Sequence, residues 1–113
     1  MAAIPINLKI DKGADFSAVF TLTDEYGEPI NLNSHIVISS FSNSYISTNK
    51  QNFTVNIINS SDGIIELKLS AVQTSLLKLP RYVYDVILIA PINIGGSKIR
   101  VIEGILEVSP GVS

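Results

Sequence analysis

The sequence predicts an all-β fold, an immunoglobulin-like antiparallel β-sandwich of about seven strands with one short helix. Isoleucine is the commonest residue, whereas alanine and arginine are scarce, and β-branched side chains favour strands over helices. Apolar and polar residues alternate with a period of two, and turn signals recur about every 8–12 residues. That spacing is typical of an immunoglobulin-like sandwich. A small β-barrel is the alternative.

The length and charge of the chain set limits on its class. We expect a single domain, residues 1–113, with one core. Hydrophobic residues make up 46% of the chain, charged residues 16%, and the net charge is -2. This composition argues against disorder and against a basic surface for nucleic acid or an anionic membrane. No apolar run approaches the length of about 20 residues that crosses a bilayer.

The sequence lacks cysteine and a secretory signal, and both features exclude further classes of site or location. The chain has no cysteine, which excludes disulfides, thiolate zinc sites and a thiol nucleophile. Its first residues lack a basic region followed by an apolar stretch. We therefore expect no secretory signal and no export by the general pathway.

The first half of the chain contains three predicted strands with alternating apolar and polar side chains: residues 4–10, 16–22 and 35–41. Residues 11–13 form a turn between the first two strands, and Asp24 and Gly27 fit the first and fourth positions of a type I turn. The third strand has apolar residues on both faces, so we expect it to be central in its sheet. Residues 42–52 are rich in serine and asparagine and are predicted to form a long exposed loop.

The middle of the chain predicts a hairpin followed by the helix. The hairpin strands are residues 53–58 and 64–69. The Asp-Gly pair at 62–63 favours a tight turn between them, because both residues tolerate positive φ. Ser70 and Gln73 have the spacing of a capping box, and Pro80 ends the helix. We expect a helix of one or two turns that carries the chain from one sheet to the other.

The last third of the chain is the most apolar and predicts two paired strands, residues 81–90 and 98–108, joined by a hairpin loop at 91–97. Gly104 marks a bulge or the close approach of another backbone. Apolar residues lie on both faces of these two strands. This favours a subunit interface there, and an edge strand in this region would add to a neighbouring sheet.

Residues suited to catalysis or metal binding are few. The single histidine, His35, has no orienting partner and no companion ligands in the sequence, so we expect it at the surface or in a turn. The run Gly-Gly-Ser-Lys at 95–98 lacks the spacing of a phosphate loop and fits a hairpin loop. Aspartates in the predicted turns are explained by hydrogen bonds to their own backbone better than by calcium: Asp11, Asp15, Asp24 and Asp62. We therefore predict no enzymatic activity, no catalytic residue, no metal site and no cofactor.

Asp85 lies inside an apolar strand and needs a partner if its face is buried. Arg100 on the neighbouring predicted strand is the favoured partner, and Arg81 is the second candidate. Glu103 falls roughly opposite Asp85 if residues 91–97 form the loop. We predict a structural ion pair between Asp85 and Arg100; the alternative is a contact at an interface.

Four aromatic residues are predicted interface residues, because aromatic side chains are enriched where proteins meet: Phe41, Tyr45, Tyr82 and Tyr84. Tyr82 and Tyr84 share one face of their strand, which is either core or an exposed patch. A tyrosine near the start of the sixth strand is also typical of the tyrosine corner of these sandwiches.

Several stretches of the chain, taken together, resemble one family. Residues 12–16, 20–24 and 27–32 (Gly-Glu-Pro-Ile-Asn-Leu) resemble the opening of small immunoglobulin-like domains in tailed-phage virion proteins. Residues 81–86 (Arg-Tyr-Val-Tyr-Asp-Val) and 100–104 (Arg-Val-Ile-Glu-Gly) fit the same pattern. The chain is similar over nearly its whole length to the immunoglobulin-like N-terminal domain of phage baseplate upper proteins.

The resemblance implies a structural or attachment role in a phage particle and transfers no catalytic residue. We therefore expect a non-enzymatic virion protein of the tail, neck or baseplate, made in the host cytoplasm. Its expected partners are copies of itself and other phage structural proteins, with no nucleic acid and no membrane. The alternative is a small adhesin or a carbohydrate-binding decoration domain, which an exposed aromatic cluster around residues 42–52 would favour.

Overall fold

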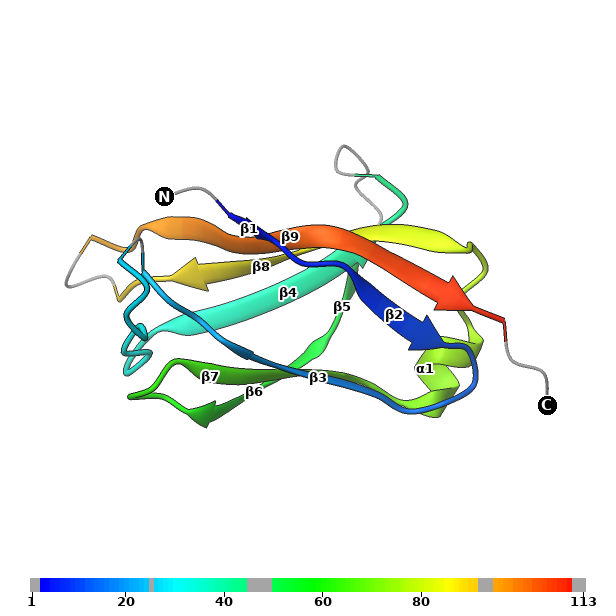
Figure 1. Cartoon of the computed structure of the whole chain (residues 1–113), viewed down its shortest axis with the longest axis horizontal. Helices are drawn as coiled ribbons and strands as arrows, with labels where there is room; N and C mark the ends of the chain where they lie inside the picture. The colour runs from blue at the N-terminus through cyan, green and yellow to red at the C-terminus, as the bar shows by residue number, and fades with distance from the viewer. Residues whose placement is uncertain (1–2, 25, 45–49, 92–94, 111–113) are drawn as a thin grey trace.

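The chain folds as two β-sheets packed face to face (Figure 1), and the computed structural model describes residues 3–24, 26–44, 50–91 and 95–110. Sheet A contains β1 (Ile4–Pro5), β2 (Leu8–Asp11), β4 (Ile36–Ser42), β5 (Gln51–Asn52), β8 (Arg81–Ile89) and β9 (Lys98–Ser109). Sheet B contains β3 (Phe16–Thr21), β6 (Thr54–Asn59) and β7 (Ile64–Leu69). One helix, α1 (Ala71–Ser75), lies between β7 and β8 in the chain. The predicted sandwich with one short helix is confirmed.

The order of the strands is that of an immunoglobulin sandwich. In sheet B the order is β3-β7-β6, and in sheet A it is β5-β4-β8-β9, with β1 and β2 both paired to β9. The chain passes from sheet A to sheet B between β2 and β3 and between β5 and β6, and it returns to sheet A between β3 and β4 and through α1 between β7 and β8. These neighbours match the B-E-D and C-F-G strands of the immunoglobulin fold.

The N-terminal strand differs from its prediction. In place of one strand over residues 4–10 there are two short ones, β1 and β2, and both run parallel to β9. The chain bends between them, where Ile6 N–H donates to the Glu103 carbonyl (2.9 Å) and Asn7 Oδ1 accepts from Ile105 N–H (3.0 Å). Side-chain alternation predicts strands but carries no information on the direction of the partner strand, which explains the difference.

The bend depends on Gly104. A Cβ atom at this position would lie 2.0 Å from the Ile6 carbonyl oxygen and 2.7 Å from its carbon, so no other residue fits without movement of the backbone. The Tyr84 hydroxyl, from the residue opposite Gly104 in the β8–β9 register, donates to the same Ile6 carbonyl. The predicted close approach at Gly104 is therefore confirmed, and the approaching backbone is the N-terminal segment.

The predicted elements of the middle region are confirmed. The β6–β7 hairpin pairs Val55 with Leu67 and has an irregularity between Ile57 and Asn59. In α1, the Ser70 side chain accepts from the Gln73 N–H and the Gln73 side chain accepts from the Ser70 N–H, which is the capping box. As expected, α1 carries the chain from sheet B to sheet A.

The third predicted strand is central in its sheet, as expected, whereas part of the loop predicted after it forms a strand. β4 lies between β8 and β5, so it is central in sheet A. Of the predicted loop at 42–52, residues 51–52 form β5, which pairs with Ser40 and Phe41 of β4. Residues 45–49 lie outside the described residues.

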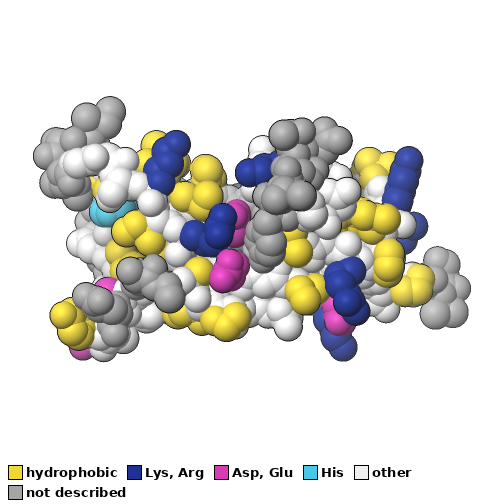
Figure 2. Space-filling view, turned by 90° about the horizontal axis from the view of Figure 1, so that it is seen from above, with side chains coloured by type: hydrophobic (Ala, Val, Ile, Leu, Met, Phe, Trp, Pro, Cys, Tyr) yellow, Lys and Arg dark blue, Asp and Glu magenta, His cyan; other side chains and the backbone are white. Residues whose placement is uncertain are grey.

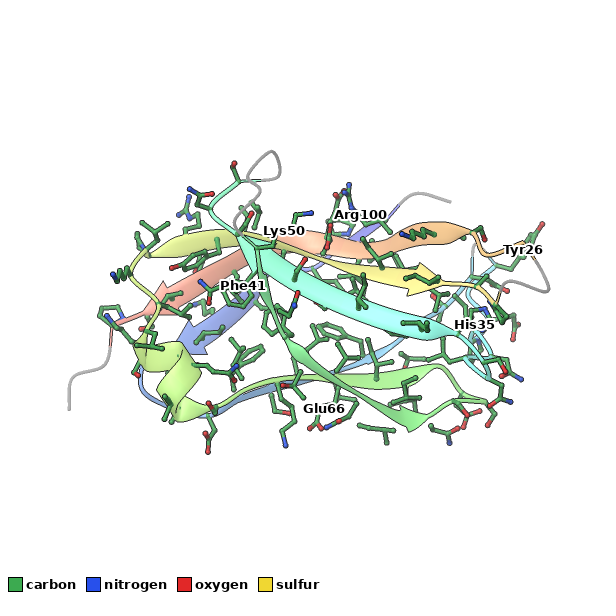
Figure 3. The ribbon with its side chains drawn as sticks, turned by 180° about the vertical axis from the view of Figure 1, so that it is seen from behind. Tyr26, His35, Phe41, Lys50, Glu66 and Arg100 are labelled. Carbon is green, nitrogen blue, oxygen red and sulfur yellow. The ribbon has the colours of Figure 1, made fainter. Side chains whose placement is uncertain are left out.

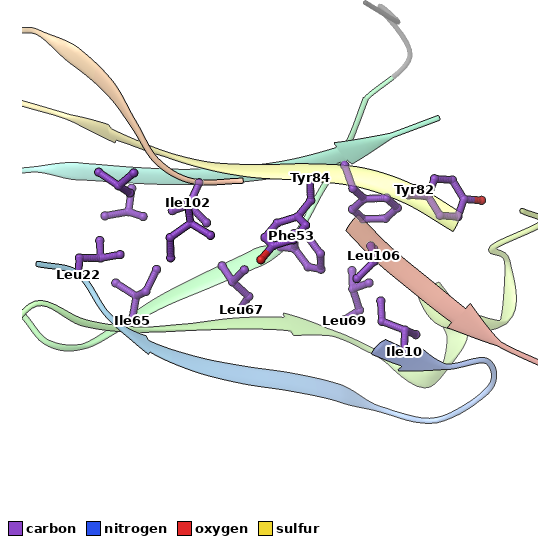
Figure 4. Close-up of a cluster of buried hydrophobic side chains, with 14 of the residues drawn as sticks. Ile10, Leu22, Phe53, Ile65, Leu67, Leu69, Tyr82, Tyr84, Ile102 and Leu106 are labelled. Carbon is purple, nitrogen blue, oxygen red and sulfur yellow. The ribbon is translucent and has the colours of Figure 1, made fainter. Parts of the chain in front are cut away.

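The core fills the space between the sheets (Figure 4). It consists of apolar side chains that alternate along the strands of both sheets, among them Ile10, Leu22, Phe53, Ile65, Leu67, Leu69, Tyr82, Tyr84, Ile102 and Leu106. Four contacts link five aromatic rings in the core: Phe16 lies against Phe53, Phe53 against Phe41 and Tyr84, and Phe41 against Tyr82 at 5.5 Å between ring centroids. Edge-to-face and tilted contacts of this kind add to the burial of apolar area.

Candidate functional site

Three of the predicted interface aromatics lie in the core instead. Phe41, Tyr82 and Tyr84 are at most 7% exposed, so the prediction that they contact a partner is wrong. Both faces of the 81–90 segment are apolar, and the sequence alone did not show which face turns inward. The structure places Arg81 and Asp85 on the other face of β8, and that charge pattern was the available signal. The fourth residue, Tyr45, lies outside the described residues.

Tyr82 has a structural role that was also predicted. Its hydroxyl oxygen accepts hydrogen bonds from the N–H groups of Lys78 (3.1 Å) and Leu79 (3.2 Å). This is the geometry of a tyrosine corner, in which a tyrosine early in a strand bonds the backbone a few residues upstream. It fixes the connection between α1 and β8.

The predicted ion pair is confirmed. Arg100 Nε lies 3.1 Å from Asp85 Oδ2, and a second guanidinium nitrogen lies 3.7 Å from Glu103 Oε2. Asp85 and Glu103 face each other across β8 and β9. The side chains of Arg100 and Asp85 are 49% and 13% exposed, so the cluster lies on the outer face of sheet A. Its two carboxylates and one guanidinium satisfy one another, as in a structural ion-pair network.

The outer face of sheet A also carries four neighbouring isoleucines, which we call the isoleucine patch: Ile36, Ile38, Ile87 and Ile89. Ile36 faces Ile89 across β4 and β8, and Ile38 faces Ile87. Ile36 and Ile38 are 58% and 48% exposed, and the other two are half-buried. Directly opposite residues of an antiparallel pair share one face, so the four side chains form one apolar surface.

Figure 2 shows this side of the molecule, with acidic and basic side chains together near its middle and hydrophobic side chains on either side of them. On β9, Lys98 and Arg100 lie beside the isoleucine patch, because they face Ile89 and Ile87. An apolar area bordered by charged residues is typical of a protein–protein contact surface.

The outer face of sheet B is polar by comparison. At its centre, Glu66 accepts hydrogen bonds from the Ser17 hydroxyl (2.7 Å) and, more weakly, the Asn56 amide (3.4 Å). The bond from Ser17, followed by that from Asn56, lowers the pKa of Glu66 below its usual value. The exposed apolar residues Val19, Ile57 and Ile58 lie on β3 and β6, which β7 separates. The two outer faces therefore differ, and the apolar one belongs to sheet A.

The predicted subunit interface on the last two strands stays a prediction, and the structure limits the surface that these strands offer. β8 lies between β4 and β9, so it offers no free edge, and β1 and β2 cover β9 over Ile102–Ser109. Of the outward apolar side chains of β8, Ile87 and Ile89 belong to the isoleucine patch, and Val83 is half-buried on the same face. The other half of the patch comes from β4, which the sequence had indicated only through the alternation of Ile36 and Ile38.

His35 and Asp24 both make local hydrogen bonds. His35 lies just before β4, where its Nδ1 is 3.0 Å from the Asn33 carbonyl oxygen. Asp24 Oδ1 accepts from the N–H groups of Tyr26 and Glu28, the turn role predicted for it. Within the described residues there is no group of three or more potential metal ligands, and no helix there is both long and apolar enough to cross a membrane.

No protein-family model matches the chain, and no curated protein matches it either. The resemblance to immunoglobulin-like domains of tailed-phage virion proteins therefore stays a prediction that rests on the residues quoted for it. The fold and the asymmetry of its two outer faces are independent of that resemblance.

Proposed function

We propose that this chain is a non-enzymatic structural protein of a tailed-phage particle, in the tail, neck or baseplate, that works through protein–protein assembly. The observation that carries the assembly role is the isoleucine patch on the outer face of sheet A. The phage setting comes from the resemblance of residues 12–16, 20–24, 27–32, 81–86 and 100–104 to virion domains. Partners are copies of this chain and other structural proteins of the particle.

Burial of the patch supplies the driving force for assembly. Covering a fully exposed isoleucine side chain contributes about 1.5–3 kcal/mol. Ile36 and Ile38 are already about half covered, so each retains roughly half of that amount for an interface. The ion pairs of Arg100 with Asp85 and Glu103 satisfy these three charges within one chain.

Self-association is tested first, by light scattering with the purified chain at high micromolar concentration. We expect a mass above that of the monomer, because an exposed apolar surface of this kind favours contact with a second molecule. A monomeric mass throughout the concentration series would remove self-association from the proposal.

The phage setting is tested by mass spectrometry of purified particles from the phage that encodes the chain. We expect the chain to be present at a copy number that is a multiple of three or six, as in closed cyclic assemblies. Absence of the chain from the particles would overturn the virion role, whatever its state of association in solution.

A further inference from the structure

One edge of sheet B has no neighbouring strand. β3 pairs with β7 along its whole length, Phe16–Thr21, and no described strand lies on its other side. In an immunoglobulin sandwich of the constant type, the first strand fills this place beside strand B. Here the N-terminal strands β1 and β2 pair with β9 instead. Figure 1 looks onto this side of the molecule, with β1, β2 and β3 towards the viewer.

One hydrogen bond shows which residues of β3 face this edge. Directly after β3, the Leu22 N–H donates to the carbonyl of Gly63, next to β7 (2.8 Å). Alternate residues of a strand direct their backbone groups to opposite neighbours. Ser17, Val19 and Thr21 therefore direct their N–H and carbonyl groups away from β7. None of these groups has a hydrogen-bond partner within the part of the chain that the structure describes.

The segment that follows β3 leaves this edge clear. The Leu22 carbonyl accepts a hydrogen bond from the Ile30 N–H (2.9 Å), and Thr23 forms a bridge with Pro29. Because the backbone groups of Leu22 point towards β7, residues 28–30 lie on that side of the chain. They do not occupy the place beside β3.

The opposite edge of sheet B is joined to sheet A. Just before β6, the Phe53 N–H donates to the Ser39 carbonyl of β4 (3.0 Å). Figure 3 shows this side, where the chain passes from sheet A through β5 into β6. The edge of sheet B that is open along its whole strand is therefore that of β3.

Three apolar side chains of β3 are incompletely covered. Phe16, Ala18 and Phe20 lie directly opposite buried residues of β7, and opposite residues share one face of a sheet. They therefore face the core, yet each is only half-buried. A strand beside β3 would cover them with every second side chain, and this burial favours binding.

The edge also lacks the usual protection against pairing. Natural edge strands carry charged residues, prolines or bulges that discourage a further strand. β3 has the sequence Phe-Ser-Ala-Val-Phe-Thr, and its register with β7 has no irregularity. No charged residue occurs between Asp15 and Asp24. An uncharged strand with apolar residues at alternate positions therefore fits this edge best.

We infer that β3 binds an extended, uncharged segment of another protein of the assembly as an added strand of sheet B. The segment forms N–H···O=C hydrogen bonds with Ser17, Val19 and Thr21, and its alternate apolar side chains cover the inner face of β3. Strand addition of this kind is an established mode of peptide recognition. The inference names a kind of partner for the assembly role proposed above, and it rests on that proposal.

The arrangement of the two sheets favours an extended segment over a second folded copy. On this side, sheet A continues beyond β9 with β1 and β2, whereas sheet B ends at β3. Two copies that paired through β3 would bring their β1 and β2 strands against each other. An extended segment occupies the width of one strand, about 4.8 Å, and avoids this overlap.

Strand addition is tested with a synthetic peptide, Lys-Thr-Val-Thr-Val-Thr-Val-Thr-Lys, whose apolar residues alternate between soluble ends. Amide chemical shifts of the isotope-labelled chain follow binding, and hydrogen exchange is then measured at about four-fifths occupancy. Bonded groups exchange only in the free fraction, so we expect the Ser17, Val19 and Thr21 N–H groups to exchange about fivefold more slowly. No binding up to about 1 mM peptide, or binding without protection of these groups, would overturn the inference.

A proline at the edge tests the backbone contact. Val19→Pro removes the central N–H donor, and proline is tolerated in an edge strand where the N–H faces solvent. We expect the dissociation constant of the peptide to rise about tenfold or more. Ile57→Pro, at an exposed residue of β6 on the other edge of sheet B, is the matched control and should leave it unchanged. Equal affinities of Val19→Pro and the wild-type chain would contradict the contact, and the exchange measurement needs no variant to fold.

The outcomes separate this inference from the function on which it rests. If the chain self-associates but the peptide does not protect β3, strand addition is wrong and assembly through the isoleucine patch stands. If the chain is monomeric and the peptide protects β3, self-association is removed and strand addition remains the route to assembly.

Discussion

At the scale of single residues, Gly104 decides how the N-terminal segment lies on sheet A. A Cβ atom at this residue would lie only 2.0 Å from the Ile6 carbonyl oxygen. We expect Gly104→Ala to lower the free energy of unfolding by about 1–3 kcal/mol, because overpacking forces the backbone to move. Urea denaturation measures the change. Glu107→Ala, an exposed site on the same strand, is the control and should change stability little. A Gly104→Ala variant as stable as the control would show that the backbone at Ile6 moves aside without a cost in free energy.

Tyr82 is the second residue at which one side-chain group, the hydroxyl, contributes to stability. Its hydroxyl accepts two backbone N–H groups in the segment between α1 and β8. We expect Tyr82→Phe to lower the free energy of unfolding by about 0.5–1.5 kcal/mol, since both donors lose their acceptor. Tyr26→Phe is the control, because that side chain is 82% exposed in a turn. Equal denaturation midpoints for the two variants would contradict a role for the tyrosine corner in stability.

At the scale of elements, α1 is short and depends on contacts at its ends. Ser70 begins it with the capping box, and the Asp15 carboxylate accepts from the Ala71 N–H (2.7 Å). Thr74 binds the turn between β2 and β3, since its hydroxyl accepts a hydrogen bond from the Gly13 N–H (3.0 Å) and donates one to the Ala14 carbonyl (2.9 Å). A helix of this length is not stable by propensity, so these bonds and its packing maintain it.

The cap gives a direct test of this dependence. We expect Ser70→Ala to reduce the free energy of unfolding by about 1 kcal/mol, because the N–H of Gln73 loses its side-chain acceptor. Val72→Ala, at a position of α1 that is 70% exposed, is the control. Thermal denaturation followed by circular dichroism measures both. No difference between the variants would mean that packing alone holds the helix.

At the scale of the whole molecule, the two outer faces of the sandwich have different chemistry. Sheet B presents Glu66 and its hydrogen-bonded neighbours to solvent, and sheet A presents the isoleucine patch beside an uncharged strand edge. The association proposed for the isoleucine patch depends on apolar burial. This contribution is not screened by salt in the way that exposed charge pairs are.

This difference predicts how association responds to salt. We expect the dissociation constant of the wild-type chain to change less than about threefold between roughly 0.05 and 0.5 M NaCl, because the isoleucine patch carries no charge. Sedimentation equilibrium at a series of salt concentrations measures it. A steep weakening with salt would instead assign the contact to the charged residues of the molecule and would contradict association through the isoleucine patch.

Local features of this protein were predictable from local sequence. Ser70 and Gln73 predicted the cap, Asp62-Gly63 predicted the hairpin, and Gly104 predicted a close approach, because each depends on a few neighbouring residues. The Asp85–Arg100 pair was predictable from the register of one hairpin. The two-sheet class followed from the period of the strands and the spacing of the turns.

Features that depend on distant segments were decided only by the tertiary structure. Both faces of β8 are apolar in sequence, and the packing of sheet B against one of them placed Tyr82 and Tyr84 in the core. The parallel pairing of β1 and β2 with β9 joins residues about a hundred positions apart, which alternation cannot encode. Alternation of Ile36 and Ile38 determined that they share a face of β4. Whether this face stays exposed depends on the strands that lie beside β4, and the sequence does not give them. A strand edge exists only once the strands of a sheet are in place.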